Sequence, residues 1–258
     1  EDGSRCGLME IVRGLRDHGW AGTFFLDVYE QAKWGDTALR GLAVNLRDAG
    51  QDVALHTHPQ WAYDPARNAM YTYSLDEQTR IVADGVRMLQ AWTGQPVVAH
   101  RAGAYTANTD TIEALARNGI VLDSSLFWNQ PESHLNGLGM PRNLPSTTHG
   151  ITEIPVTVYD REDRAPVLAS LWRAPRVTRK LDPNWFVTEA EMHAAITGAV
   201  DAHVPVIVVF LHSFSFMTAG SSPSHPVRDA HAAAMFRAML DDVAARGLTV
   251  RTMRTLAT

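Results

Sequence analysis

The feature that most constrains the fold of this chain is a repeated alternation of short apolar runs with longer amphipathic patterns. The run at 204–211 (VPVIVVFL) is apolar on both faces, which is typical of a buried parallel strand. Residues 75–92 show helical periodicity, and Ser74 precedes them with Glu77 three positions later, the pattern of a capping box. This alternation predicts an α/β fold with a parallel sheet or barrel.

The same patterns predict where the remaining elements lie. The expected strands are residues 21–28, 52–55, 96–99, 120–122, 153–158, 204–211 and 248–253. The expected helices are residues 37–49, 75–92, 108–118, 189–203 and 230–246. Residues 129–150 and 160–187 are expected to be long irregular loops. No linker divides the chain, so we expect one domain over residues 1–258.

Composition excludes several classes of function. The 258 residues are 45 % hydrophobic, which is enough for a large core, and their net charge of −5 does not suggest a nucleic-acid partner. The sequence contains no run of 18 apolar residues, so it predicts no membrane-spanning helix. The single cysteine, Cys6, excludes a disulfide within the chain and slightly favours the cytoplasm over secretion. Nothing in the sequence indicates an oligomeric state.

The strongest chemical signal is the sequence Leu55-His56-Thr57-His58-Pro59, directly after an expected strand. Residues two apart in extended backbone point to the same side, so His56 and His58 direct their imidazoles into one space. Two neutral imidazoles at the C-terminal end of a strand are a common way to bind a zinc-like ion. The alternative is that they are unrelated polar residues in a loop.

Three other positions could complete such a site. Asp2 could be the carboxylate ligand, although spacing alone favours a solvated acidic terminus. Arg101 follows an expected strand and could lower the pKa of a catalytic carboxylate, or could belong to an ordinary turn. His212 ends the run at 204–211 and could protonate a leaving amine, or could cap the next segment.

These motifs, in this order, resemble those of the NodB-type polysaccharide deacetylases, carbohydrate esterase family four. The resemblance covers nearly the whole chain. The matching segments are Glu1-Asp2-Gly3, Gly22-Thr23-Phe24-Phe25, His56-Thr57-His58-Pro59, Arg101-Ala102-Gly103-Ala104-Tyr105 and Phe210-Leu211-His212. The resemblance implies a distorted (β/α)7 barrel, and because an acidic motif stands at residue 1, we expect its first strand to precede this numbering.

The resemblance also implies a metal centre and a reaction. Asp2, His56 and His58 would hold one divalent ion, commonly Zn²⁺, with Co²⁺ or Ni²⁺ as alternatives. The substrate would be an acylated sugar or a related small amide, which loses an N-acetyl or O-acetyl group to activated water.

Catalytic roles follow from the same resemblance. Glu1 would be the base, Arg101 would orient it, and His212 would be the acid. The backbone N–H of Tyr105 would polarise the acyl carbonyl. Four residues are expected at the substrate, two of them in the loosely matched aspartate–tryptophan motif; they are Trp61, Gly103, Asp123 and Trp128.

Several positions depart from the family pattern. The base position holds Glu1 rather than aspartate, and the two histidines are two residues apart rather than four. Gly103-Ala104 stands where proline is usual. These features indicate a divergent branch with a compressed His-x-His-Pro motif.

Two other functions stay open. A non-catalytic relative could use the same barrel to bind a glycan, with Glu1 marking lost activity. A different metal-dependent amidohydrolase, or a glycosidase, could use the same scaffold. A glycosidase needs two carboxylates across the scissile bond, whereas the strand ends here offer mostly histidines and one acidic cluster.

Overall fold

The computed structural model describes residues 7–162, 176–183, 187–219 and 226–258. Its central feature is a six-stranded sheet of order β1-β2-β3-β4-β6-β5. The strands are β1 (Thr23–Asp27), β2 (Asp52–Thr57), β3 (Ala99–Ala102), β4 (Leu122–Asp123), β5 (Ser146–Thr148) and β6 (Ile151–Glu153). All neighbours pair in parallel except β5, which forms an antiparallel hairpin with β6 at the edge. The predicted α/β class with a mostly parallel sheet is confirmed.

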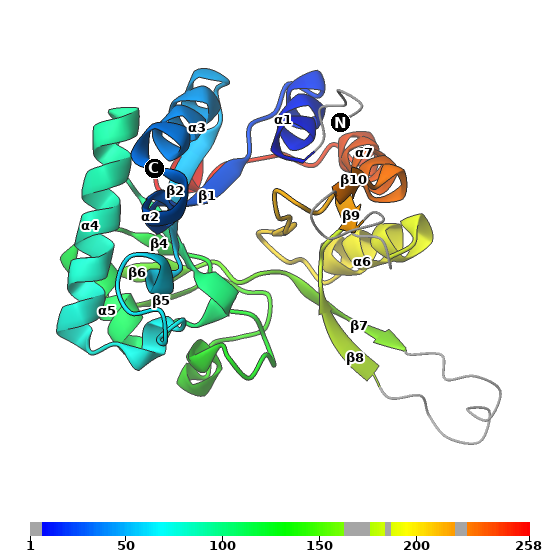
Figure 1. Ribbon diagram of the computed structural model, residues 1–258. Helices are drawn as coiled ribbons and strands as arrows, with labels where there is room; N and C mark the ends of the chain where they lie inside the picture. Colours follow the sequence, from blue (N-terminus) through cyan, green and yellow to red (C-terminus); the bar gives the residue numbers. More distant parts are fainter. Residues whose placement is uncertain (1–6, 163–175, 184–186, 220–225) are drawn as a thin grey trace.

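Two groups of helices flank the sheet (Figure 1). The first group contains α2 (Gln31–Trp34), α3 (Asp36–Asp48), α4 (Leu75–Thr93) and α5 (Thr109–Arg117). The second contains α1 (Leu8–Asp17), α6 (Glu189–Asp201) and α7 (Ala230–Ala245), which share one apolar cluster. Short helices make up the rest: η1 (Val28–Glu30), η2 (Pro59–Trp61), η3 (Met70–Thr72), η4 (Gly103–Tyr105), η5 (His134–Leu138) and α8 (Met253–Leu256). Helix α1 is not among the predicted elements.

Helix α4 forms as its sequence predicts. The Ser74 side chain accepts a hydrogen bond from the Glu77 backbone N–H, and the Glu77 carboxylate accepts one from Ser74 N–H, so the capping box is present. Gly94 ends the helix in the left-handed conformation, with φ of 68°. Ile81 and Leu89 lie on its buried face, which packs against the sheet.

The run at 204–211 differs from its prediction as a strand, because it forms no strand ladder in the described part of the chain. Its side chains nevertheless alternate as in extended backbone. Val206 and Val208 pack in the cluster that includes Ala54 and Leu122, whereas odd-numbered side chains pack in the cluster of the second helix group. The backbone bonds to irregular segments instead, with Val208 N–H donating to the Thr157 hydroxyl at 2.8 Å. Both faces of the run pack against apolar clusters as predicted, but only Phe210 is buried and no ladder forms in the described ranges.

Several other expectations differ from the structure, among them the irregular loop at 129–150, which contains η5 and β5. Residues 248–253 are not a strand; they run without a ladder into α8. The segment 160–187 is not wholly irregular, because β7 (Val158–Glu162) pairs with β8 (Arg176–Lys180) in an antiparallel hairpin that extends away from the sheet (Figure 1). The expected strand 153–158 is divided between the end of β6 and the start of β7.

A second two-stranded ribbon joins β9 (Met217–Ala219) to β10 (Pro226–Arg228). Over the described ranges the main ladder runs from β1 to β5 without closing on itself, so closure of a barrel stays a prediction. None of the described helices combines the length and the apolar composition needed to cross a bilayer.

Candidate metal and acyl-transfer site

Polar residues at the C-terminal ends of β1, β2 and β3 form one row. In the strand register Asp27 lies beside His56, and His56 lies beside Arg101. Residues paired across parallel strands point to the same face, so these side chains start from one face of the sheet. The sheet therefore brings His56 and Arg101 together as expected. It adds Asp27, which sequence analysis missed although a carboxylate at the end of an apolar run was a signal.

Asp27 is 8 % exposed, and one of its carboxylate oxygens accepts a hydrogen bond from Tyr29 N–H at 3.0 Å. Burial raises the pKa of this carboxyl to about 8, against the hydrogen bond from Tyr29, which lowers it. A proton on Asp27 at neutral pH means that this row carries no fixed negative charge from β1.

The orientation of His56 leaves one ring nitrogen free. Its Nδ1–H donates to the backbone carbonyl of Arg101 at 2.7 Å, because a carbonyl can only accept. The lone pair is then on Nε2. Burial, and the neighbouring His58 after it, hold the pKa of His56 well below its usual value. A neutral imidazole fixed through Nδ1 is the form that binds a metal ion through Nε2.

His58 lies beside it, with ring centroids 4.9 Å apart and an angle of 81° between the planes. Burial lowers the pKa of His58 as well, so it too is neutral near pH 7. Its ring lies against the backbone of Gly103, where a Cβ atom would come within 2.5 Å of Nδ1 and Cε1. Gly103, which we expected at the substrate, thus makes room for a predicted metal ligand.

Gly103→Ala is expected to move the His58 ring while leaving the fold intact, because the atoms in the way belong to the end of a side chain. A displaced ligand should weaken metal binding by about 10–100-fold, as loss of a supporting group does. Titration calorimetry with Zn²⁺ measures this change. Gly137→Ala is the control, since no atom lies within 4 Å of a Cβ there. Equal zinc affinity in Gly103→Ala and the parent would contradict the assignment.

The guanidinium of Arg101 is buried between polar and aromatic groups. Its Nε donates to Ser124 O at 2.8 Å and its Nη2 to the Ser124 hydroxyl at 2.7 Å. Its Cζ lies 4.3 Å from the centroid of the Phe25 ring. No carboxylate of the described ranges is within ion-pair distance of it. Burial lowers the pKa of Arg101, and a buried cation of this kind favours a carboxylate or another anion nearby.

Tyr105 occupies a strained backbone position at the end of η4. Both Ala104 (φ 48°) and Tyr105 (φ 63°) are left-handed, which is uncommon for residues with a Cβ. The Tyr105 ring packs edge-on against Phe127 at 5.0 Å, and its buried hydroxyl has no hydrogen-bond partner in the described part of the chain. Strained backbone is typical of functional turns.

His212 lies between two aromatic rings, edge-on to Phe210 at 4.7 Å and stacked on Phe214 at 4.5 Å. Although His212 is exposed to solvent on one side, desolvation by its neighbours, and then the positive charge of Lys180, lower the pKa of His212 to about 4. An acid that works near neutral pH needs a higher pKa than this. Proton donation by His212 therefore needs additional negative charge beside it.

Lys180, at the end of β8, was not found by sequence analysis. Its Nζ lies 3.9 Å from the Phe210 ring centroid and 3.4 Å from an Asp182 carboxylate oxygen. Burial lowers the pKa of Lys180, while Asp182 raises it. The sequence did not predict that Lys180 reaches the site, because the segment that carries it was expected to be an irregular loop rather than a strand.

Lys180→Met is expected to raise the pKa of His212, because it removes the positive charge that lowers this pKa most. Proton NMR titration of the His212 ring measures the shift. A folded-state pKa of about 4 lies below the unfolded value of about 6.5. The unfolded chain therefore binds more protons between these values, and His212 makes the protein less stable as the pH falls from 6.5 to 4. This loss should shrink in Lys180→Met, and an unchanged His212 pKa would contradict the contact.

Asp123, which we expected at the substrate, lies in a buried network behind this row. It is fully buried and paired in register with His100, whose Nδ1 lies 2.7 Å from its carboxylate. The other ring nitrogen of His100, Nε2, lies 3.0 Å from the hydroxyl of Thr57. Thr57 is the residue between His56 and His58, the two candidate metal ligands. Because its side chain has no solvent exposure in this structure, we expect Asp123 to act through His100.

Glu153 extends the network from β6. Burial raises the pKa of Glu153 well above its usual value, and the adjacent Asp123 carboxylate raises it further. Hydrogen bonds from His100 and Glu153 hold the pKa of Asp123 low, although burial acts to raise it. These opposite shifts favour the proton on Glu153 over Asp123.

The remaining predicted site residues divide into two groups. Trp61 is 37 % exposed and follows His58 by three residues, whereas Trp128 is half-buried. Glu1 and Asp2 lie outside the described residues. In the ranges described, no three His, Cys, Asp or Glu side chains gather around one point, so His56 and His58 need a ligand such as Asp2 to complete a site.

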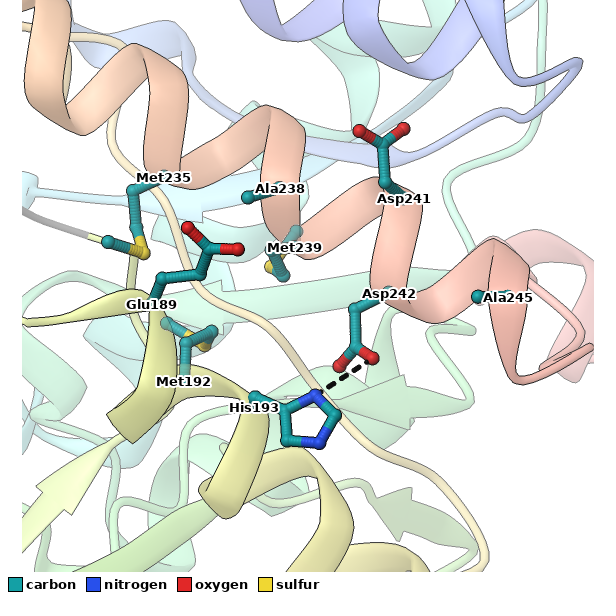
Figure 2. A pocket seen from close by; sticks show the side chains of 9 residues that line it. All are labelled: Glu189, Met192, His193, Met235, Ala238, Met239, Asp241, Asp242 and Ala245. Atoms are coloured by element: carbon teal, nitrogen blue, oxygen red, sulfur yellow. Dashed lines mark hydrogen bonds and ion pairs between the residues drawn. The ribbon is translucent and has the colours of Figure 1, made fainter.

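A separate cavity of about 350 Å³ lies between α6 and α7 (Figure 2). Met192, Met235 and Met239 line it, and His193 at its edge is 3.0 Å from an Asp242 carboxylate oxygen. Arg246 also donates to Asp242, at 2.9 Å. None of the predicted site residues lines this cavity, so the row at the strand ends is the better candidate for chemistry.

No family model matches the sequence, and no curated protein matches it. Solved structures do resemble the chain. A candidate polysaccharide deacetylase from Mycobacterium smegmatis has a TM-score of 0.60 at 19 % identity, over 96 % of this chain and 74 % of that one. A family 4 acetyl xylan esterase from Clostridium thermocellum, in complex with a cobalt ion, has a TM-score of 0.52 at 12 % identity, over 96 % and 82 % of the two chains.

A family 4 carbohydrate esterase pseudoenzyme from Bacillus anthracis is also similar, with a TM-score of 0.53 at 14 % identity. The alignment covers 97 % of this chain, which spans 60 % of the length of that protein. The resemblance to NodB-type carbohydrate esterases is thereby confirmed at the level of the fold, across nearly all of the chain.

Proposed function

We propose that this chain, which has the fold of the family 4 carbohydrate esterases, is a metal-dependent deacetylase of acylated sugars. The observation that carries the proposal is the His56–His58 pair. Both imidazoles are neutral, they lie 4.9 Å apart, and His56 is fixed through Nδ1 with Nε2 free. A pair of neutral, oriented imidazoles suits a zinc-like ion once a carboxylate such as Asp2 completes the site.

His56, His58 and Asp2 would hold the ion. When bound, a divalent cation supplies a Lewis acid for the acyl carbonyl and an activated water. Glu1 would take the proton from that water. Arg101, rigidly bonded to Ser124, would hold the Glu1 carboxylate in place and keep it ionised.

The other residues act on the acyl group and the leaving group. The Tyr105 backbone N–H would donate to the carbonyl oxygen as charge develops there. His212 would protonate the departing nitrogen or oxygen, and a base with negative charge nearby would raise its pKa from about 4. Trp61 and Trp128 would contact the sugar. We further propose that the apolar run at 204–211 completes a distorted (β/α)7 barrel around this site.

A second candidate is a non-catalytic glycan-binding relative. Two observations favour it: glutamate stands at the base position, and a pseudoenzyme is among the structural neighbours. Both functions use the same binding surface, so only turnover separates them.

Metal content and acetate release test the proposal. The parent should contain about one zinc-like ion per chain and release acetate from N-acetylated or O-acetylated sugar oligomers. The double variant His56→Ala/His58→Ala should lose both. His193→Ala/His231→Ala removes two exposed histidines from α6 and α7 and should retain both. Metal without acetate release supports the glycan-binding relative, and no metal after incubation with zinc, cobalt or nickel sinks the deacetylase.

A further inference from the structure

Two exposed tryptophans and one lysine form a compact surface group beside the candidate site. Trp34 ends α2 and is 58 % exposed, while Trp61 ends η2 and is 37 % exposed. The Lys33 Nζ lies 4.6 Å from the Trp34 ring centroid and 4.9 Å from that of Trp61. We call Lys33, Trp34 and Trp61 the indole platform.

The indole platform is tied to the predicted metal ligands by the backbone. Helix η2 begins at Pro59, directly after His58, and Trp61 N–H donates to His58 O at 3.3 Å. Helix α2 follows β1, whose last residue is paired in register with His56. The platform and the histidines are therefore carried by the same two strand ends.

The Lys33 ammonium is exposed and held by aromatic faces. In the described ranges no carboxylate lies within ion-pair distance of it. Contact with two indoles fixes the position of the charge while its N–H donors stay open to solvent. Exposed indoles are costly to leave in water, and such rings commonly serve to bind a ligand with an apolar face.

We propose that the indole platform is a subsite for a sugar residue that carries a carboxylate, in a chain longer than one sugar. The C–H face of the ring would stack on an indole and the carboxylate would pair with Lys33. This proposal deepens the proposed function, on which it rests for the identity of the neighbouring site. It names an acidic polysaccharide as the substrate class.

Calorimetry with sugars that carry no acyl group tests the platform without turnover. The probes are hexagalacturonate, which is acidic, and xylohexaose, which is neutral. The parent should bind hexagalacturonate at least ten-fold more tightly, and added salt should reduce this difference. Lys33→Met should abolish the preference, and Trp34→Ala should weaken both complexes at least ten-fold. Val227→Ala, an exposed apolar side chain on β10, should change neither.

Equal binding of the two probes, no binding of either, or unchanged binding in Lys33→Met and Trp34→Ala would each overturn the proposal. These outcomes differ from failure of the proposed function. A protein that binds hexagalacturonate through the platform but releases no acetate loses the hydrolase assignment and keeps the subsite. A protein that releases acetate equally well with and without an intact platform keeps the hydrolase assignment and loses the subsite.

Discussion

Replacing Asp123 with alanine is expected to lower the free energy of unfolding by about 1–3 kcal/mol, the range for leaving buried hydrogen-bonding groups without their partner. The carboxylate is fully buried and receives hydrogen bonds from Ser125 and His100. Its removal leaves His100 without a partner on Nδ1 and leaves the Glu153 carboxyl facing a cavity. Urea denaturation followed by circular dichroism measures the change.

Glu153→Gln is the matched control for this loss. Because the pKa of Glu153 is raised, its side chain is expected to be neutral, and glutamine is an uncharged side chain of the same shape. Glu153→Gln should therefore lower the free energy of unfolding by only roughly 1 kcal/mol, the order of one ordinary hydrogen bond. A larger loss in Glu153→Gln than in Asp123→Ala would show that the proton and the charge are assigned to the wrong partners.

Arg101→Lys is expected to reduce kcat/KM for acetate release by about 10²-fold, which is the order that a misplacement near 1 Å produces. A lysine keeps the charge but cannot make the two bonds to Ser124 while lying flat on Phe25. The base that Arg101 would orient then loses its fixed partner. Steady-state kinetics on an acetylated sugar oligomer measures the effect.

Zinc content is the control for Arg101→Lys, because the backbone carbonyl of residue 101, not its side chain, holds His56. The variant should bind zinc as the parent does. Wild-type kcat/KM in Arg101→Lys would remove Arg101 from the catalytic machinery, whereas loss of zinc would mean that the side chain supports the metal ligands instead.

Patterns that depend on local chemistry predicted the structure well. Helix α4 follows from its capping box and Gly94, and the His-x-His spacing correctly indicated two imidazoles in one space. These patterns involve residues only a few positions apart, so they do not depend on contacts with distant parts of the chain.

Features that depend on distant partners were missed. The run at 204–211 has the composition of a central strand, but its backbone groups bond to Thr157 and Leu181 rather than to a ladder. Lys180 reaches the site only because β8 pairs with β7 and passes Phe210. Asp123 was expected to contact the substrate, whereas in the structure it is buried and hydrogen-bonded to His100. Nothing in the local sequence specifies these partners.

The contact between the His58 ring and Gly103 links two features of this sequence: the two-residue spacing of the histidines and the glycine where the motif that it resembles has proline. A histidine two residues after His56 places its ring where a Cβ at position 103 would be. Proline, the usual residue in the motif that this segment resembles, has such an atom, so the short histidine spacing favours glycine at position 103. Among homologues of this chain, positions 58 and 103 should therefore covary, with glycine at 103 accompanying the two-residue histidine spacing.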